Sequence, residues 1–537
     1  MRRFACGVVI CLLVATSLAV LPSAAAQQRW SWQQAPATVL PTGDLEWDPE
    51  PFEFVAGDSV RYIDFAGGDD ANDGLSTQTP WQHHPWDPNA ADNAAACSGP
   101  HTYLFKRGVI YRGALESTES GAATDPIHLT SDPSWGEGQA MLYGSERISG
   151  GWSRCTAGDA PEGMAEAAKV WYADLPDGAT PRCLWMVGPE EIVRLKLART
   201  PNWQVSDPQE IKSEWWEWEN PEWWKAGGHK TENPEGKRIH LGIDTEHLTE
   251  PADYYQDALV WTEYGIMMGT PFASRVETVD TEQNAIGFQG VWYGDSGQII
   301  RGNRYYLENK PHYLDEPGEF YYAEDGPHAG RLYVRLPGDA DPNETVLEAA
   351  RRYNLIDMRG VGHVHVSGLT FRFTNVWDLP ARGFVHEDVD CACVRMLGSG
   401  EDIQVRNCRF EHVNKAVRIK AVGDTDYVDD VVVADNEILH TDHGAISVSD
   451  GARWGKEEPP KGELGRVAVL RNRLHRIGLR PIRSGHGHAV HVGFPAVAEI
   501  AGNILHRCYG AGLFMFGGKG SGYRGEAPLA RLLVHHN

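Results

Sequence analysis

The sequence predicts an all-β fold in which short parallel strands stack into a solenoid. In the last third of the chain one phrase recurs: an apolar strand, an asparagine, an apolar residue and then a polar one. The asparagines of the five copies lie 29, 36, 31 and 34 residues apart by subtraction: Asn407, Asn436, Asn472, Asn503 and Asn537. An irregular period of about 20–50 residues is typical of solenoids, whose units bury their apolar faces by stacking. We therefore expect a parallel β-helix with the asparagines hydrogen-bonded as a ladder between coils.

The first 26 residues have the composition of a secretory signal peptide. Arg2 and Arg3 precede an apolar run from Phe4 to Leu21, and the small residues Ala24 to Ala26 offer a cleavage site. No second long apolar run follows. We expect a secreted or periplasmic protein with no membrane span after cleavage.

Changes in periodicity divide the chain into regions. Short strand-like runs separated by Gly and Asp turns follow the leader, the period then breaks, and the repeats run to the end. The expected regions are 1–26, signal peptide; 27–60, an extended segment; 61–144, N-terminal β-helix coils; 145–349, an inserted β-rich, sandwich-like domain; and 350–537, the main repeats. Because the chain stops inside a repeat, we expect a truncated C-terminus.

The charge balance excludes one class of function. The chain has 49 basic and 74 acidic residues, and loss of Arg2 and Arg3 with the signal peptide changes the net charge from −25 to −27. Nucleic-acid binding needs a basic surface and is not expected. No cofactor is expected to be required. The oxygen-rich segment Gly68 to Gly74 could hold Ca²⁺, although an ordinary Asp/Asn/Gly turn explains it as well.

Cysteine usage points to disulfides more than to metal binding. Seven cysteines remain after signal cleavage and no CxxC spacing occurs, so no metal site is predicted. Cys155 with Cys183, and Cys391 or Cys393 with Cys408, are the pairs we expect in an oxidising compartment.

Each repeat carries a second strand, and these strands predict a stripe of outward side chains. Aligned on their apolar positions, the strands are 393–397, 416–420, 445–449, 489–493 and 512–516. Alternation in a β-strand sends every second residue outward, about 4.8 Å from the next coil. The outward residues are Arg395, Arg418, Lys420, Ser447, Ser449, His491 and Phe514. A solvated sheet face explains this stripe as well as a groove for an acidic or hydroxyl-rich ligand does.

Titratable residues gather at the turns beside this stripe. Asp390 and Asp442 occupy equivalent turns two coils apart, about 9–10 Å, and Asp450 leaves the strand that follows Asp442. Paired carboxylates at about 5–9.5 Å catalyse glycoside hydrolysis, whereas turn capping is the structural alternative. Three histidines, His443, His486 and His488, join His491 here, and Trp454 lies in a long loop that we expect to wall the cleft.

Several segments resemble one group of enzymes. They are Tyr62-Ile63-Asp64 with Gly67 to Gly74, Ala198 to Asn202, Leu314 to Phe320, and Gly330 to Val334. The chain resembles secreted right-handed parallel β-helix carbohydrate-active enzymes, in particular glycoside hydrolases with an inserted β-sandwich of the α-L-fucosidase and xylanase types. The resemblance implies catalytic carboxylates on the face of the repeats.

The sequence therefore leads us to expect a monomeric polysaccharide-degrading glycoside hydrolase. Asp442 with Asp390 or Asp450 would be catalytic. The four histidines would hydrogen-bond the sugar, and Arg395, Arg418 and Lys420 would hold an acidic or sulfated substituent.

Two alternatives stay open. In the first, a polysaccharide lyase uses Lys420 to abstract the proton beside a uronate carboxylate, and a metal or an arginine neutralises that carboxylate. In the second, the solenoid binds glycans without catalysis.

Overall fold

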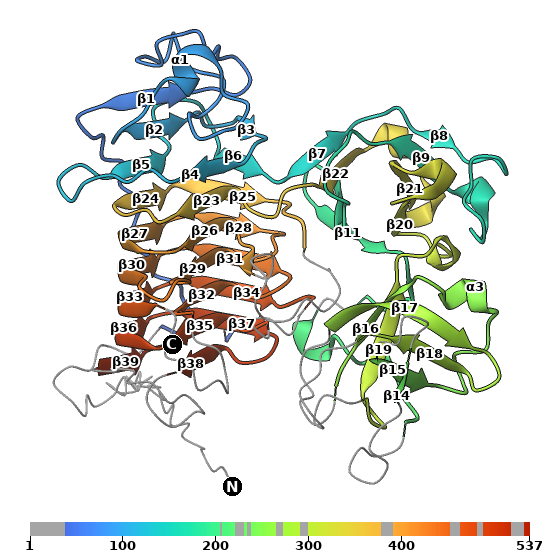
Figure 1. Ribbon diagram of the computed structural model, residues 1–537. Helices are drawn as coiled ribbons and strands as arrows, with labels where there is room; N and C mark the ends of the chain where they lie inside the picture. The colour runs from blue at the N-terminus through green and yellow to red at the C-terminus, as the bar shows by residue number, and fades with distance from the viewer. Residues whose placement is uncertain are drawn as a thin grey trace, which may run out of the picture. The chain divides into compact units, whose positions relative to one another are not determined.

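A computed structural model describes residues 38–43, 45–204, 207–220, 230–232, 238–264, 272–289, 299–376, 390–451, 462–480, 487–516 and 531–537 (Figure 1). The chain divides into two compact units, 1–46 with His536, and 47–535 with Asn537. In the smaller unit, Val39 and Leu45 form an isolated antiparallel bridge. All that follows concerns the larger unit.

Three parallel sheets carry the repeats (Figure 1). Sheet 1 is β1 (Val60–Ile63), β2 (Thr102–Phe105), β5 (Ile127–Thr130), β24 (Val364–Ser367), β27 (Gly400–Arg406), β30 (Tyr427–Ala434), β33 (Glu463–Leu470), β36 (Pro495–Ala501) and β39 (Arg531–His535). Sheet 2 is β3 (Ile110–Tyr111), β6 (Ala140–Tyr143), β25 (Leu369–Arg372), β28 (Arg409–Glu411), β31 (Glu437–Thr441), β34 (Arg473–Ile477) and β37 (Ile504–Cys508). Sheet 3 is β4 (Leu115–Ser117), β23 (Ile356–Arg359), β26 (Val394–Leu397), β29 (Val417–Lys420), β32 (Ile446–Ser449), β35 (Val490–Gly493) and β38 (Leu513–Phe516).

From β24 onward, successive strands enter sheets 1, 2 and 3 in rotation, so each repeat adds one strand to each sheet. The all-β class is confirmed. The inward residues of all three sheets meet in one apolar core, for example Val405 of sheet 1, Phe410 of sheet 2 and Val417 of sheet 3, all fully buried. Each such side chain contributes about 1.5–3 kcal/mol of burial free energy.

The predicted asparagine ladder is present but begins one coil later than expected. Nδ2 of Asn436 donates to Oδ1 of Asn472, and Nδ2 of Asn472 donates to Oδ1 of Asn503, each at 2.9 Å. Asn503 continues to Asn537 at 2.7 Å. Asn407 is not a member.

The strand register explains this error. Arg406 pairs with Ala434, so the next residue, Asn407, is level with Asp435, and Cys408 is level with Asn436. The amide of Cys408 accordingly donates to Oδ1 of Asn436 at 3.0 Å. In the first copy of the repeated phrase, the residue level with Asn436 is therefore Cys408. Aligning the copies on their asparagines was wrong by one residue at this copy.

Two further sheets, here called the inserted sheets, use strands between Ser145 and Ala350. The first is β7 (Ser145–Ile148), β22 (Val346–Ala350), β10 (Leu184–Val187), β11 (Ile192–Leu197), β20 (Glu319–Tyr322), β21 (Arg331–Arg335), β9 (Trp171–Asp174) and β8 (Ser153–Arg154). The second is β12 (Arg199–Thr200), β19 (Arg304–Glu308), β16 (Leu259–Thr262), β17 (Phe272–Asp280), β18 (Ala285–Phe288), β15 (Arg238–Ile243) and β14 (Lys230–Glu232), with β13 (Trp216–Glu217) beside β19. The predicted domain limits stay a prediction.

Helices are few and short. Among the described residues the α-helices are α1 (Asp92–Ala95) and α3 (Ala252–Tyr255), and the 3₁₀ turns are η1 (Ala167–Lys169), η2 (Pro208–Glu210), η4 (Pro311–Tyr313), η5 (Gly326–His328), η6 (Pro337–Asp339) and η7 (Pro342–Glu344). Within the described part of the chain, no helix is both long and apolar enough to cross a membrane.

The cysteine pairs expected from the sequence are not formed. None of the seven cysteines of the described residues forms a disulfide bond. Cys155 packs in a core of the inserted sheets, whereas Cys183 packs with Trp185 and Phe373 in a different cluster. The two thiols therefore lie in separate apolar environments.

The segment expected to be either a Ca²⁺ loop or a turn has its carboxylates engaged in hydrogen bonds. Asp70 accepts from the amide of His83 at 2.7 Å and contacts its ring at 2.8 Å. Asp73 accepts from the hydroxyl of Thr79 at 2.6 Å. Both contacts are those of a stabilised turn.

Candidate functional site

The predicted stripe on sheet 3 has the register that the sequence indicated. Arg395 pairs with Arg418, Arg418 with Ser447, Ser447 with His491, and His491 with Phe514. Aligning the strands on their apolar residues therefore placed these five side chains on one line. This part of the prediction is confirmed.

The cations of the stripe are buried and paired. Arg395 and Arg418 are only 6% and 5% exposed. Arg395 forms a two-point ion pair with Asp357 at 2.8 and 2.5 Å. Arg418 and Lys420 both bind Asp390, at 2.7 and 2.9 Å. The basic stripe is thus largely balanced by carboxylates, and its role in holding an acidic sugar stays a prediction.

Asp390 is held in its ionised form. Burial alone would raise its pKa, but the guanidinium of Arg418 and the ammonium of Lys420 hold that pKa well below its usual range. A carboxylate in this state can act as a nucleophile or base. It cannot donate a proton at neutral pH while both cations remain in contact.

Asp442 lies at the end of β31 and faces the inserted sheets. It is 1% exposed, and Oδ1 accepts from Nη1 of Arg194, in β11, at 2.5 Å. Burial lowers the pKa of Arg194, but the adjacent Asp442 outweighs this effect and raises it above its ordinary value. Asp442 is therefore a second ion-paired carboxylate, held by a different partner from that of Asp390.

Asp450 is buried but lies at the other end of β32 from Asp442. The four residues of β32 alone span about 13 Å. This distance exceeds the 5–9.5 Å needed between paired catalytic carboxylates. Asp450 is therefore too far along β32 to pair with Asp442, and the pairing of Asp442 with Asp390 stays a prediction.

Burial keeps the rings of His443 and His488 neutral at pH 7. His443 is 1% exposed, neither ring nitrogen has a hydrogen-bond partner, and burial is the main cause of a pKa far below its usual value. Burial lowers the pKa of His488 to about 4, and its Nδ1 accepts from the amide of Ala511 at 3.0 Å. His491 contacts the hydroxyl of Ser447 at 3.1 Å. His486 and Trp454 lie outside the described residues.

One residue of this region was missed by the sequence argument. Lys415, in the turn before β29, is 4% exposed, and burial lowers its pKa to about 8. The like charge of Arg418 lowers the pKa further, and Lys415 in turn depresses that of His443. A lysine between two apolar runs looks like any surface lysine in a sequence, so no signal could have singled it out.

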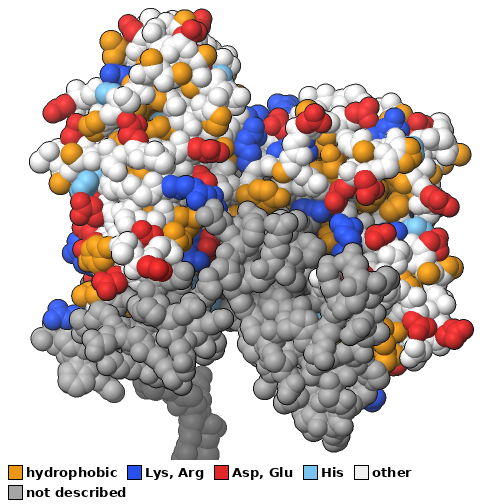
Figure 2. Space-filling model, viewed as in Figure 1, with side chains coloured by type: hydrophobic (Ala, Val, Ile, Leu, Met, Phe, Trp, Pro, Cys, Tyr) orange, Lys and Arg blue, Asp and Glu red, His pale blue; other side chains and the backbone are white. Residues whose placement is uncertain are grey.

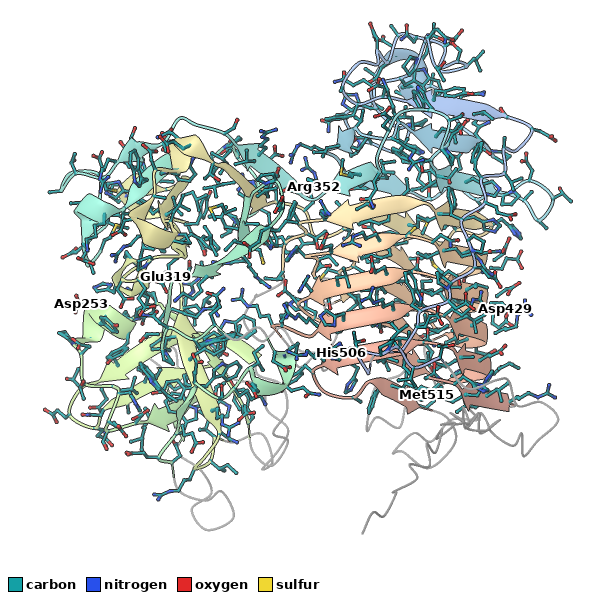
Figure 3. All side chains as sticks on the ribbon, turned by 180° about the vertical axis from the view of Figure 1, so that it is seen from behind. Asp253, Glu319, Arg352, Asp429, His506 and Met515 are labelled. Atoms are coloured by element: carbon teal, nitrogen blue, oxygen red, sulfur yellow. The ribbon has the colours of Figure 1, made fainter. Side chains whose placement is uncertain are left out.

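A pocket of about 850 Å³ lies between sheet 2 and the inserted sheets. Its inserted-sheet wall is 187–196 with Arg199, Trp203 and Gln204. Its other wall is Arg372, Arg409, Glu411, His412, His440, Arg476, Leu479 and Arg480. Figure 2 shows Lys and Arg side chains (blue) where the stacked sheets 1 to 3 adjoin the inserted sheets. Figure 3, seen from behind, shows His506 of β37 on the edge of sheet 2 that faces the inserted sheets.

None of the predicted site residues that the structure describes lines this pocket. Asp442 reaches it through Arg194, whose guanidinium is shared between the carboxylate and the pocket wall. Arg199 and Arg480 both bind the buried Glu308 from β19. Sequence reasoning missed the pocket because its two walls come from segments about 200 residues apart.

On the sheet 2 wall, one side chain from each coil forms a ladder. Its members, here called the positive-φ ladder, are level in the strand register and have φ between +53° and +61°: Phe373, His412, His440, Arg476 and Arg507. The rings of His412 and His440 stack 4.8 Å apart at 9°. Burial is the main cause that lowers the pKa of both histidines, so both are neutral at pH 7.

Glu411, His412 and His440 are the residues that could hold a metal ion. One ligand atom from each lies within 4.8 Å of the others. However, the carboxylate of Glu411 already binds Arg372 at 2.6 Å and Arg409 at 3.3 Å. A divalent cation would have to enter next to two guanidinium groups, which disfavours it.

Comparisons with known proteins give remote similarities of structure. No protein-family model matches the chain, and no curated protein matches its sequence. A solved structure described as "Glycoside hydrolase" is similar with a TM-score of 0.43 and 13% identity, over 88% of this chain and 97% of that chain. A second, described as "The complex structure of XylC with xylose", has a TM-score of 0.41 and 13% identity, over 85% of this chain and 60% of that chain.

Proposed function

We propose that this protein is an exported glycoside hydrolase that cleaves an acidic or sulfated polysaccharide. Its scaffold would be a right-handed parallel β-helix, formed by the rotation of strands through sheets 1, 2 and 3, with the inserted sheets as a sandwich-like domain. The signal-like first 26 residues support export.

The pocket beside sheet 2 is the observation that carries this proposal. Its volume of about 850 Å³ falls within the range of about 300–1,000 Å³ found for ligand sites. Guanidinium, imidazole and carboxylate groups line it together with Trp203. Such donors bind hydroxyl and carboxylate oxygens.

For hydrolysis we propose Asp442 and Asp390 as the carboxylate pair. One of the two must be protonated to assist the leaving group. An acidic substrate that takes over Lys420, which is partly exposed, would withdraw one of the two cations that lower the pKa of Asp390 and would raise that pKa, with Arg418 still in contact. Asp390 would then serve as the acid and Asp442, ion-paired to Arg194, as the base or nucleophile.

Elimination is a second candidate, favoured by the protonation states of the basic residues. A lyase needs a neutral base beside a cation that neutralises the uronate carboxylate. Lys420 is engaged by Asp390 and is a poor base. The buried Lys415, with a pKa of about 8, and the neutral His443 are better bases, and Arg418 influences Lys415 directly.

A panel of acidic and neutral polysaccharides tests both candidates. We expect new reducing ends from at least one acidic polymer and little from its neutral counterpart. Products of hydrolysis have no ultraviolet absorption of an unsaturated uronate, whereas elimination produces it. Asp442→Asn should abolish hydrolysis, and Lys415→Met should abolish elimination.

Asp430→Asn is a matched control for these variants. Asp430 is also ion-paired, to Arg466, but lies in sheet 1. We expect full activity from it. Binding of glycans without any cleavage across the panel would overturn the proposal in favour of a non-catalytic glycan-binding protein.

A further inference from the structure

Most of the cations around the pocket are compensated by carboxylates. Arg194 binds Asp442, Arg199 and Arg480 bind Glu308, and Lys196 binds Glu316 and Glu319. Each of these cations therefore already has a carboxylate partner. A fixed, unbalanced charge must therefore be sought on the other wall.

Arg476, on the sheet 2 wall, is the exception. It lines the pocket, and among the described residues it makes no ion pair and no hydrogen bond, while its Nε is buried without a partner. A buried N–H donor without an acceptor costs free energy, and such a group in a folded protein is often completed by water or an ion. The guanidinium is charged at every accessible pH.

The outward face of sheet 2 carries an excess of positive charge. Apart from Arg507, which binds Asp207 outside the sheet, its four arginines are Arg372, Arg409, Arg473 and Arg476, and its two carboxylates are Glu411 and Glu437. Glu437 is shared by Arg409 and Arg473. The difference is four minus two, or +2. Such a surface attracts anions and repels a metal ion.

The positive-φ ladder places further polar groups next to Arg476. His440 is the neighbouring rung in β31 and His412 the one after it. Within the described residues neither ring forms a hydrogen bond, and Nδ1 of His440 is buried without a partner. Imidazole N–H groups and a guanidinium are donors that suit the oxygens of a sulfate, phosphate or carboxylate group.

We infer that Arg476, His440 and His412 form an oxyanion subsite on the sheet 2 wall of the pocket. This deepens the proposed function, on which its biological meaning rests: the subsite would hold the sulfate or carboxylate substituent of the glycan. The anion accepts hydrogen bonds from Arg476 and His440 and balances the excess positive charge of sheet 2. Glu411, Arg409, Arg372 and Arg194 are the charged groups that surround the two imidazoles.

Calorimetric titration of the full chain with sodium sulfate tests the subsite directly. We expect one site on the wild type and a loss of affinity of at least about tenfold in Arg476→Gln, since a charge-assisted contact is removed. Arg473→Gln is the matched control: it removes an arginine three residues earlier on β34 that already binds Glu437 and does not line the pocket. Its affinity for sulfate should change less than about threefold.

A second variant keeps the test informative if Arg476→Gln folds poorly. His440→Phe retains a ring for stacking but removes both nitrogens, and we expect weaker sulfate binding with an unchanged thermal midpoint. In the wild type, sulfate should raise the pKa of the imidazoles, seen as a shift of the histidine proton resonances. Titrations with glucuronate and phosphate then distinguish a carboxylate, a sulfate and a free phosphate ligand.

Two results would overturn the inference. One is sulfate binding that is equal in the wild type, Arg476→Gln and His440→Phe. The other is stoichiometric binding of Zn²⁺ that requires Glu411, with no binding of sulfate. Failure of this inference can be told apart from failure of the proposed function. A wild type that cleaves glycans but does not bind sulfate refutes only the subsite. A wild type that binds sulfate at this subsite but cleaves no glycan refutes only the proposed enzyme activity.

Discussion

Asn472 is the central rung of the asparagine ladder, and replacing it by alanine tests what holds successive coils together. Oδ1 of Asn472 accepts from the amide and from Nδ2 of Asn436, at 3.1 and 2.9 Å. Its Nδ2 donates to the carbonyl of Val433 and to Oδ1 of Asn503, both at 2.9 Å. The side chain is fully buried.

The magnitude follows from the groups that lose their partner. In Asn472→Ala the amide of Asn436 and the carbonyl of Val433 lose the contacts from Asn472, while Nδ2 of Asn436 keeps the carbonyl of Val405 and Oδ1 of Asn503 keeps the amide of residue 472. Two buried groups at about 1–3 kcal/mol each give a loss of about 2–6 kcal/mol. Hydrogen exchange of β30, β33 and β36 measures local opening and should accelerate by about 30-fold to 2 × 10⁴-fold.

Asn407→Gly is the matched control. Asn407 belongs to the same sequence phrase but lies off the ladder, where its Nδ2 donates to the carbonyl of Glu50. Glycine accepts its φ of +50° without strain. We expect a loss of about 1 kcal/mol or less. Equal effects of the two substitutions would refute the idea that the ladder, and not the phrase as such, stabilises the coils.

Three further predictions concern buried charges. Arg194→Met leaves Asp442 buried without its cation and should lower the free energy of unfolding by about 3–5 kcal/mol. The double variant Arg194→Met with Asp442→Asn should recover part of this loss. A double variant whose loss equals the sum of the two single losses would contradict the pairing. The folded pKa of Lys415 is lowered to about 8, so the unfolded chain binds more protons than the folded one between about pH 8 and 10.4. The unfolding free energy of the wild type in urea should therefore rise over that range by up to about 3 kcal/mol relative to Lys415→Met. Parallel plots of unfolding free energy against pH for the two proteins would exclude the pKa shift. The folded pKa of Asp390 is depressed, so its stabilising effect is present above the unfolded pKa of about 3.9 and is lost as the pH falls through the folded pKa. The thermal midpoints of the wild type and Asp390→Asn should therefore converge in acid. A constant difference between the two midpoints down to low pH would count against the ion pairs.

The local alternation of residues carried the sequence argument further than the asparagine phrase did. Apolar alternation in sheet 3 placed Arg395, Arg418 and His491 on one line, since every second residue of a strand faces the same way. The phrase itself slipped at Asn407, because Asn and Cys both occur at that turn and only the inter-strand pairing shows which is level with Asn436.

What could not be predicted depends on contacts between distant segments. Arg395 and Arg418 of the stripe are buried together with their partners Asp357 and Asp390. Which carboxylate pairs with which cation depends on side-chain geometry. The pocket requires β11 to lie against sheet 2, and Arg194 and Asp442 are 248 residues apart. No local pattern encodes such a contact.

The position of a bound acidic oligosaccharide tests the central claim most directly. Crystals soaked with an oligosaccharide of the cleaved acidic polymer should show it in the pocket between β11 and sheet 2. One of its anionic groups should lie against Arg476 and His440, and a glycosidic bond should lie toward Asp442. An oligosaccharide bound anywhere else, with the pocket empty, would contradict the account.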